Sequence, residues 1–592
     1  MNAAGTAARL VGLWALSSAA RWLAAMPIVE PRIFRDELIH WQMARAFAFH
    51  EPFVLFGQVV HYPAVLYPAV LSVAFSAGDA RAAFDVAQAV NAMLVSAVVF
   101  PAYALAREFG KRDAAVAVAA LAVLTPCGVY SALMMEENLY YPLFVLACWL
   151  ALRVLLRGRA RDAAACAVAL GLAYLAKPLA LVLIGAYGVA VFAWGALALR
   201  GRGRTRDARG PLLAPFAVRA GPLIALGAAL LARHALAAPA QASGSAGAVL
   251  LSRFYAEEMS GPIIPAIAPA AAVAVALLAA LALGTGVVPV ASLVSRRSER
   301  TDPTRAWLAG FAVLVMLLYL LAGARHTVLM NSSLRPHERY LFAVGPLLFA
   351  AFLTARTPPI GRVAAGVVLA TIVLSVSPLA HLTLTRATPI DAPSLTLPWL
   401  LRRNFGSGLE AAAVIGLLAL MATLGAARAR SRLWPCTAWL AVLPLVLNVG
   451  WYSELYSQTS LGPPSRLITA IEQRIRPDER VAVVLLQPDE AIGRLSYYLK
   501  FWLGERSITY WASGDEVPWY ADLSGPAENA AQRAIRPGYL VGGADVARLC
   551  PAARAVPALE PGPKLPVVVL HVPASGCGAP TESESSATTT PS

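Results

Sequence analysis

Long apolar stretches separated by short polar connections run along the first 450 residues of the chain. About 20 consecutive apolar residues are enough for a helix to cross the hydrocarbon core of a membrane. One of these stretches, 162–176, is short and meets the next, 178–199, at Lys177-Pro178. This pattern is also compatible with a hairpin of two unequal helices. The pattern predicts thirteen spans, at residues 9–28, 86–106, 114–133, 138–155, 162–176, 178–199, 211–235, 263–291, 306–324, 340–355, 363–382, 409–427 and 434–450.

The first apolar stretch could be mistaken for a signal peptide, but no convincing small-residue cleavage site follows it, and we expect it to be retained as an anchor. Basic residues gather in alternate connections, and cytoplasmic loops retain Lys and Arg. This places the N-terminus in the cytoplasm and, with an odd number of spans, everything after about residue 451 outside. The basic segments begin at Arg107, Arg153, Arg200, Arg296, Arg356 and Arg428.

Three segments on the outer side are substantial: the first loop at 29–85, a loop at 383–408 and the C-terminal region at 451–579. The last has the alternating patterns of a small extracytoplasmic α/β domain. Its cysteines, Cys550 and Cys577, would lie in an oxidising compartment, and we predict a disulfide between them. The polar tail 580–592 is typical of disorder. The expected helices are 464–476 and 489–503, and the expected strands are 481–486, 507–512, 538–541 and 567–572.

Composition supports a membrane protein, because 58% of the residues are apolar and only 14% are charged. Soluble domains are nearer to 45–50% apolar and 25% charged. The net charge of +15 lies in clusters between apolar stretches, so it reports topology and does not indicate a nucleic-acid partner. The predicted fold is mainly α, a polytopic bundle of about 13 transmembrane helices at 1–450 followed by the C-terminal domain.

Ionisable side chains are costly near a membrane, so their placement is informative. Each of them alone has an ordinary explanation, as a solvated loop, a helix end or a side chain reaching the headgroups. Their joint occurrence on the outer side favours a functional site there. They are Arg35, Asp36, Glu37, His61, Glu136, Glu137, Lys177, Glu257, Glu258, His326, Arg335, His337, Glu338 and Arg339.

Four segments carry a resemblance to a known family: RDELIHWQMARAFA at 35–48, HYPAVLYPAVL at 61–71, MMEENLYYPLF at 134–144 and RPHERYLFAVGPLL at 335–348. In this order and on one side, they resemble the GT-C superfamily of membrane glycosyltransferases, which use polyprenyl-phosphate sugars. The nearest branch is that of the protein O-mannosyltransferases and lipid A aminoarabinose transferases. The resemblance spans residues 1–450, and Ala64 departs from it where the family has a second proline.

The resemblance implies roles for the acidic residues. Asp36 would be the base that takes the acceptor's proton, and Glu37 would orient it or bind the acceptor. Glu137 would position the acceptor or share a divalent ion. His61, Tyr62 and Glu136 would shape the loop or contact the acceptor.

Positive charge would hold the departing phosphate, and Arg339 is the favoured ligand because a guanidinium binds phosphate through two parallel hydrogen bonds. Arg335, His337 and Lys177 are further candidates. A cofactor is not required, but a divalent cation (Mg, Mn or Ca) is compatible with oxygen ligands. Its candidate ligands are Asp36, Glu137 and His337.

The predicted function is therefore transfer of a sugar from a polyprenyl-phosphate donor to an envelope glycan, lipid or protein, at the outer face of a bacterial inner membrane and with inversion of the anomeric centre. The expected partners of the protein also include the membrane lipids that surround it. The alternatives are a transporter or flippase of lipid-linked sugars and an envelope glycan ligase or polymerase. A transporter typically has polar residues at the midplane and broken helices in repeated halves, of which the sequence shows little.

Overall fold

A computed structural model of the chain describes residues 3–32, 34–55, 58–59, 62–202, 213–242, 267–285, 289, 303–330, 336–354, 391–396, 399–400, 421, 432–459, 481–485, 498–503, 507–511, 539–542, 554–555 and 568–571. The chain divides into two compact units. The first comprises residues 1–29, 63–242 and 255–457, and the second comprises 30–62, 243–254 and 458–592. The grouping of 30–62 with the C-terminal region differs from the simple division at residue 450 that the sequence suggested.

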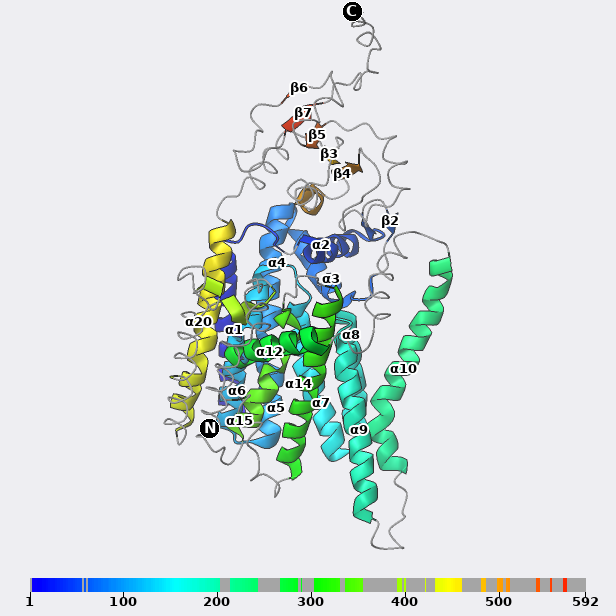
Figure 1. Ribbon diagram of the computed structural model, residues 1–592, viewed down its shortest axis with the longest axis vertical. Coiled ribbons are helices and arrows are strands. Elements are labelled where there is room, and N and C mark those ends of the chain that lie inside the picture. The colour runs from blue at the N-terminus through cyan, green and yellow to red at the C-terminus, as the bar shows by residue number, and fades with distance from the viewer. Residues whose placement is uncertain are drawn as a thin grey trace, which may run out of the picture. The chain divides into compact units, whose positions relative to one another are not determined.

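The first unit is helical, and its helices pack side by side (Figure 1). Short 3-10 segments connect several of them: η1 (Ser72–Ala77), η2 (Pro126–Ala132), η5 (Glu338–Tyr340), η6 (Phe342–Val344) and η7 (Pro393–Leu395). The helices are α1 (Ala3–Ala25), α3 (Leu66–Leu71), α4 (Ala80–Ser96), α5 (Val99–Phe109), α6 (Arg112–Leu124), α7 (Glu137–Arg157), α8 (Ala160–Ala176), α9 (Ala180–Arg202), α10 (Leu213–Ala242), α12 (Ile267–Gly284), α14 (Pro303–Met330), α15 (Gly345–Leu353) and α20 (Leu433–Thr459).

Seven helices of the described part are long and apolar enough to cross a membrane, with Ala80–Phe109 taken as one. The others are Glu137–Arg157, Ala180–Arg200, Leu213–Ala232, Ile267–Gly284, Thr304–Leu329 and Leu433–Tyr456. A polytopic helical protein is thus confirmed. The count of thirteen spans stays a prediction, since the expected span 363–382 and all of 409–427 except residue 421 lie outside the described residues.

Two expected spans differ from the structure in detail. The span at 114–133 is not one helix, because α6 ends at Leu124 and η2 follows from Pro126. Proline disfavours the helical conformation at the residue before it, and it lacks the N–H that would continue the helix. The span at 340–355 begins with two 3-10 turns, so only Gly345–Leu353 is α-helical.

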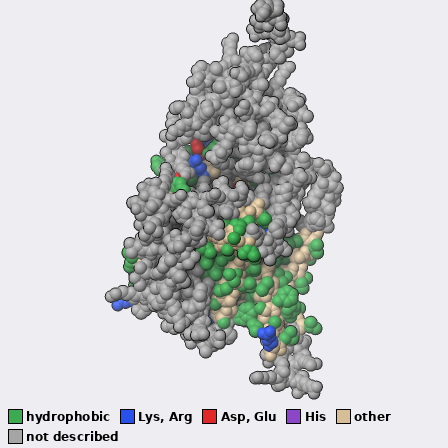
Figure 2. Space-filling model, viewed as in Figure 1, with side chains coloured by type: hydrophobic (Ala, Val, Ile, Leu, Met, Phe, Trp, Pro, Cys, Tyr) green, Lys and Arg blue, Asp and Glu red, His purple; other side chains and the backbone are tan. Residues whose placement is uncertain are grey.

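The surface of the helical unit exposes large apolar side chains, as expected for helices that face lipid. Phe192 on α9 and Leu231 on α10 are each 71% exposed. Figure 2 shows one face of the molecule, on which hydrophobic side chains dominate the described part of this surface. The described helices therefore present to lipid the side chains that a soluble protein would bury.

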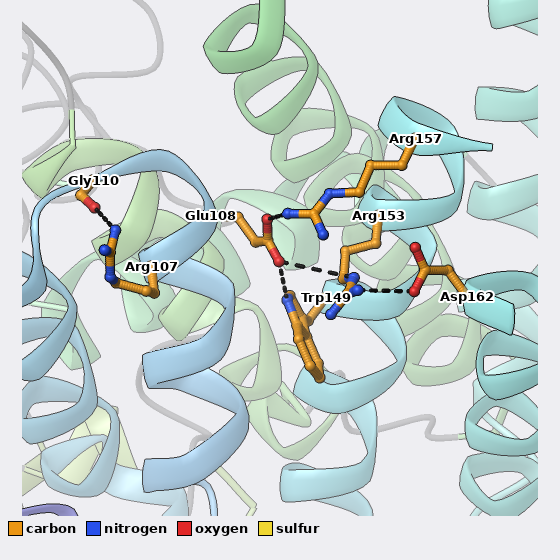
Figure 3. Close-up of polar contacts among 7 residues, drawn as sticks. All are labelled: Arg107, Glu108, Gly110, Trp149, Arg153, Arg157 and Asp162. Atoms are coloured by element: carbon orange, nitrogen blue, oxygen red, sulfur yellow. Dashed lines mark hydrogen bonds and ion pairs between the residues drawn. The ribbon is translucent and has the colours of Figure 1, made fainter. Parts of the chain in front are cut away.

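One end of α7 is held by an ion-pair network centred on Glu108 of α5 (Figure 3). Its carboxylate accepts a hydrogen bond from Trp149 Nε1 at 3.2 Å and pairs with Arg157. Arg153 lies 3.8 Å from Glu108 and 2.9 Å from Asp162 of α8. The basic cluster that the sequence indicated as a topology signal thus also joins three helices. Its members on α7, Trp149 to Arg157, lie about 18 to 30 Å along the helix axis from Glu137, toward the opposite end of α7.

The second unit contains α2 (Phe34–Phe49), a hairpin of β1 (Val54–Leu55) and β2 (Gln58–Val59), a helical segment at 498–503 and a five-stranded sheet. The sheet order is β4-β3-β5-β7-β6, where β3 pairs in parallel with β4 and β5, and β7 pairs antiparallel with β5 and β6. The strands are β3 (Val481–Leu485), β4 (Ser507–Trp511), β5 (Tyr539–Gly542), β6 (Arg554–Ala555) and β7 (Val568–His571).

Four of these strands lie where the alternating pattern of the sequence predicted them. The short strand β6 was not expected. Cys550, Cys577, the helix expected at 464–476 and the tail 580–592 lie outside the described residues, so the disulfide and the disordered tail stay predictions.

Candidate functional site

A buried lysine between two carboxylates forms the centre of the site in the helical unit. Lys177 Nζ lies 3.2 Å from Glu136 and also forms an ion pair with Glu137. All three residues are buried. Lys177 follows α8 directly and precedes Pro178, which disfavours continuation of the helix, so the side chain is placed at a turn. Glu137 begins α7, where the helix dipole favours a negative charge.

The charge state of Lys177 follows from these neighbours. Burial by itself lowers the pKa of a lysine, but the Glu137 and Glu136 carboxylates outweigh it and raise the pKa of Lys177 above its ordinary value. The lysine therefore stays protonated. Glu137 Oε2 is buried and receives no hydrogen bond from any described residue, so this oxygen is available to a ligand.

Arg339 lies near Lys177, and both flank one tyrosine ring. Lys177 Nζ is 5.4 Å and the Arg339 guanidinium 5.7 Å from the centre of the Tyr340 ring, within reach of cation–π attraction. The positive charge of Arg339 acts on Lys177 and lowers its pKa slightly against the two carboxylates. Two positive groups from separate connections thus lie near one tyrosine ring.

Two histidines complete this side of the site. His326, in α14, lies with its Nε2 3.0 Å from the Tyr340 hydroxyl. His337 Nε2 is 3.8 Å from Asp391, and its Nδ1 is 3.4 Å from the Thr327 hydroxyl. Arg335 lies outside the described residues.

The segment 391–396 is part of this site, which the sequence did not reveal. Glu338 accepts hydrogen bonds from the backbone N–H of Ser394 at 2.7 Å and from the Ser394 hydroxyl. Together with Asp391, this ties the turn that carries Arg339 to a second loop. The available signal was the position of Asp391 and Ser394 around Pro393 in the outer loop 383–408.

Glu338 gives a prediction for stability against pH. Burial raises the pKa of Glu338 from 4.5 to about 7, although the bonds from Ser394 lower it. The stabilisation by the protonated form is complete below pH 4.5 and is lost as the pH rises through about 7. At about 1.4 kcal/mol per pKa unit, this loss is about 3 kcal/mol. We expect the Tm in detergent to fall more steeply between pH 5 and 8 in the wild type than in Glu338→Gln. Equal slopes would contradict this.

The acidic pair of α2 belongs to the second unit, and its two members differ. Glu37 is fully buried and accepts a hydrogen bond from the backbone N–H of Arg32, so it fixes the turn that leads into the helix. Asp36 is partly exposed. Tyr62 lies edge-on to His40, with ring centres 6.0 Å apart, while His61 lies outside the described residues. The convergence of Asp36 with Glu137 and Arg339 stays a prediction.

A metal site was also expected as one possibility. Among the described residues, no group of three or more His, Cys, Asp and Glu side chains is arranged to hold a metal ion. The candidates Asp36, Glu137 and His337 therefore stay a prediction. What the described geometry does show is that the cations of Lys177 and Arg339 lie near one ring, and that Lys177 is paired with the buried carboxylate of Glu137.

Comparison with known proteins gives a family-model match over part of the chain and a similar fold over nearly all of it. Residues 61–206 match the family model described as dolichyl-phosphate-mannose-protein mannosyltransferase. This range includes Tyr62, Glu136, Glu137 and Lys177. A search of curated protein sequences finds no match.

The fold is similar to that of ArnT from Cupriavidus metallidurans. The structure bound to undecaprenyl phosphate is 17% identical with a TM-score of 0.54, and the apo structure is 15% identical with a TM-score of 0.53. Each match covers 96% of this chain and 99% of the other. The oligosaccharyltransferase AglB from Archaeoglobus fulgidus has a lower TM-score of 0.42, at 11% identity over 91% of this chain and 69% of that chain.

The family match covers the part of the chain that contains Glu136, Glu137 and Lys177. The shared fold extends over nearly the whole chain. The matched range includes two of the four motifs, those at 61–71 and 134–144. The helical membrane fold that the resemblance implied is thereby confirmed, and the activity that it implied stays a prediction.

Proposed function

We propose that the chain transfers a sugar from a polyprenyl-phosphate donor to an envelope glycan, lipid or protein at the outer face of a bacterial inner membrane. The observation that carries this proposal is the convergence of Lys177 and Arg339 on Tyr340, beside Glu137. A buried lysine and a partly exposed arginine at one place suit a phosphate that leaves with negative charge. ArnT, whose fold the chain shares, is known in complex with undecaprenyl phosphate.

The donor phosphate binds to Arg339 through two guanidinium hydrogen bonds, and Lys177 adds a second positive charge. His337, on the same turn as Arg339, is a further ligand, and Arg335 is another candidate from the sequence. Groups that are already oriented before the reaction stabilise the charge that develops on the departing phosphate. A lipid phosphate is a good leaving group, so no strong general acid is needed.

The acceptor's hydroxyl oxygen attacks the anomeric carbon while the bond from that carbon to the phosphate oxygen breaks. The electron pair of this bond leaves with the polyprenyl phosphate, and the acceptor's proton goes to Asp36. Attack from the side opposite the phosphate inverts the anomeric centre. Glu137 Oε2 accepts a hydrogen bond from the acceptor and so orients it.

The test uses a strain that lacks the gene, complemented with the wild type or with Asp36→Asn. We expect the deletion to remove a sugar from an envelope glycan, lipid or protein and to accumulate a polyprenyl-phosphate sugar, both measured by mass spectrometry. Unchanged glycans and carriers would contradict the transferase. If the chain were a flippase, its loss would instead leave the labelled lipid-linked sugar on the side of the membrane vesicles that corresponds to the cytoplasm.

Replacement of the phosphate ligand is a separate prediction. In Arg339→Lys the charge is kept, but the paired hydrogen bonds are lost. Hydrogen bonds to charged groups contribute about 1.5–3 kcal/mol, so we expect binding of undecaprenyl phosphate to weaken by about 10- to 100-fold. The measurement is the thermal shift of the purified protein titrated with undecaprenyl phosphate. As a control, Arg157→Lys at the opposite end of α7 is expected to bind as the wild type does, and equal binding by Arg339→Lys would remove Arg339 from the site.

A further inference from the structure

The helix α2 is contacted by a short helical segment from the other end of the sequence, residues 498–503. Both belong to the second unit of the chain. The first turn of α2 carries Asp36 and Glu37, and its second turn carries the residues that meet this segment. The described part of the chain thus joins the acidic motif to the C-terminal region.

Three contacts of different kinds connect the two segments. The rings of Trp41 and Phe501 are stacked, with centroids 4.9 Å apart and planes inclined by 11°. The side-chain amide of Gln42 donates to the carbonyl oxygens of Lys500 at 2.8 Å and Phe501 at 3.4 Å. The Tyr498 hydroxyl donates to the Pro31 carbonyl at 3.2 Å, just before α2 begins.

The residues in these contacts are shielded from solvent. Trp41 is 1% and Phe501 2% exposed, and Gln42, Tyr498 and Lys500 are also buried. A buried amide that loses its acceptor is costly, so the register of Gln42 against the segment is specific. Phe501 also packs edge-on against Trp502, which fixes its own orientation.

The arrangement of the contacts restrains α2 in several directions. Trp41 and Gln42 are consecutive, so they point about 100° apart around the helix and prevent rotation about its axis. The Tyr498 contact lies before the first turn, and the other two lie after it. Asp36 therefore lies between two attachment points, about 7 Å along the axis from Trp41.

We propose that the helical segment 498–503 of the C-terminal region positions α2 so that Asp36 meets the acceptor, through the Trp41–Phe501 stack and the Gln42 hydrogen bonds. This rests on the proposed function, in which Asp36 is the base. Trp41, Gln42 and Phe501 are positioning residues, since they act through Asp36. Through these contacts the C-terminal domain contributes to the reaction and is not purely structural.

The proposal predicts a division between kcat and KM. A misplacement of about 1 Å at the reacting groups lowers a rate by about 100-fold. Lys177 and Arg339, which bind the donor phosphate in the proposed function, belong to the other unit. Loss of the stack should therefore lower kcat while the KM for the donor stays unchanged. A merely structural contact would lower the amount of folded protein and leave kcat per folded molecule as it was.

The experiment compares Phe501→Ala, Phe501→Tyr, Gln42→Met and the control Tyr539→Ala in the full-length protein. Tyr539 is a buried aromatic of the same unit that packs against His571 within the sheet. The donor is the polyprenyl-phosphate sugar that accumulates in the deletion strain, and membranes of that strain supply the acceptor. Hydrogen exchange of peptides covering residues 31–45 reports on α2 without reference to activity.

We expect Phe501→Ala to lower kcat by about 10- to 100-fold, to leave the donor KM unchanged and to speed exchange at residues 31–45. Phe501→Tyr keeps the stack, so its kcat and its exchange at residues 31–45 should be those of the wild type. Tyr539→Ala should change neither kcat nor this exchange. Gln42→Met removes the amide donor at similar volume and should lower kcat and speed exchange at residues 31–45 to a smaller extent. This variant also tests the proposal if Phe501→Ala fails to fold.

Unchanged exchange at residues 31–45 in both Phe501→Ala and Gln42→Met would overturn the proposal. So would faster exchange with an unchanged kcat, in a protein that Asp36→Asn inactivates. If Asp36→Asn itself stays fully active, the base assignment of the proposed function is wrong, and the positioning of that base falls with it. The exchange data then still decide whether segment 498–503 holds α2.

Discussion

Asp36→Asn is expected to lower kcat for sugar transfer by about 100- to 10,000-fold, the usual contribution of a general base. Asparagine has nearly the same shape as aspartate but cannot take the acceptor's proton. Because the donor phosphate binds elsewhere in the proposed function, binding of undecaprenyl phosphate should be unchanged. The measurement is the rate at which the polyprenyl-phosphate sugar from the deletion strain is consumed by purified protein with membranes of that strain.

Glu37→Gln is the matched control, since the two acids are adjacent on α2. Glu37 is buried and receives the Arg32 N–H, and a glutamine can still accept that hydrogen bond. We therefore expect a much smaller loss of kcat than in Asp36→Asn. The opposite order, with Glu37→Gln inactive and Asp36→Asn active, would show that Glu37 is the base and that the partial exposure of Asp36 is not informative.

Lys177→Met is expected to destabilise the helical unit by about 3–5 kcal/mol, the usual effect of removing one partner from a buried ion pair. Methionine fills a similar volume but leaves two neighbouring carboxylates without their cation. The side chains of Glu137 and Glu136 are only 0% and 9% exposed, so water cannot replace the lysine. The Tm in detergent should fall, and binding of undecaprenyl phosphate should weaken because a positive charge near Arg339 is lost.

The two consequences of Lys177→Met are separated by a second change. Lys177→Met combined with Glu137→Gln removes a buried negative charge, so part of the lost Tm should return. Binding of undecaprenyl phosphate should return less, since the positive charge is still missing. A single variant with wild-type Tm would contradict the ion-pair description, and a full return of binding in the double variant would show that Lys177 has no direct part in it.

The sequence by itself determined that the chain is a polytopic helical membrane protein, and it indicated the candidate motifs. Both are local properties. A span needs only about 20 apolar residues in a row, and motif residues such as Asp36, Glu137 and Arg339 belong to short segments. The strands β3, β4, β5 and β7 also depend on a local property, the alternation of apolar and polar residues, and they were found where this alternation predicted them. The break between α6 and η2 was missed by the prediction of one span at 114–133, although Pro126 is a local signal for it, since proline acts on its own neighbours.

Only the tertiary structure decided how these segments are used. It showed Lys177 as the partner of two carboxylates 40 and 41 positions earlier, and Ser394 as the partner of Glu338. It also separated Glu37, whose carboxylate is engaged with a backbone N–H, from the partly exposed Asp36. The contact of Trp41 with Phe501 joins residues 460 positions apart. Such pairs depend on which helices pack together, and hydrophobic length and charge retention place each helix in the membrane without specifying its neighbours.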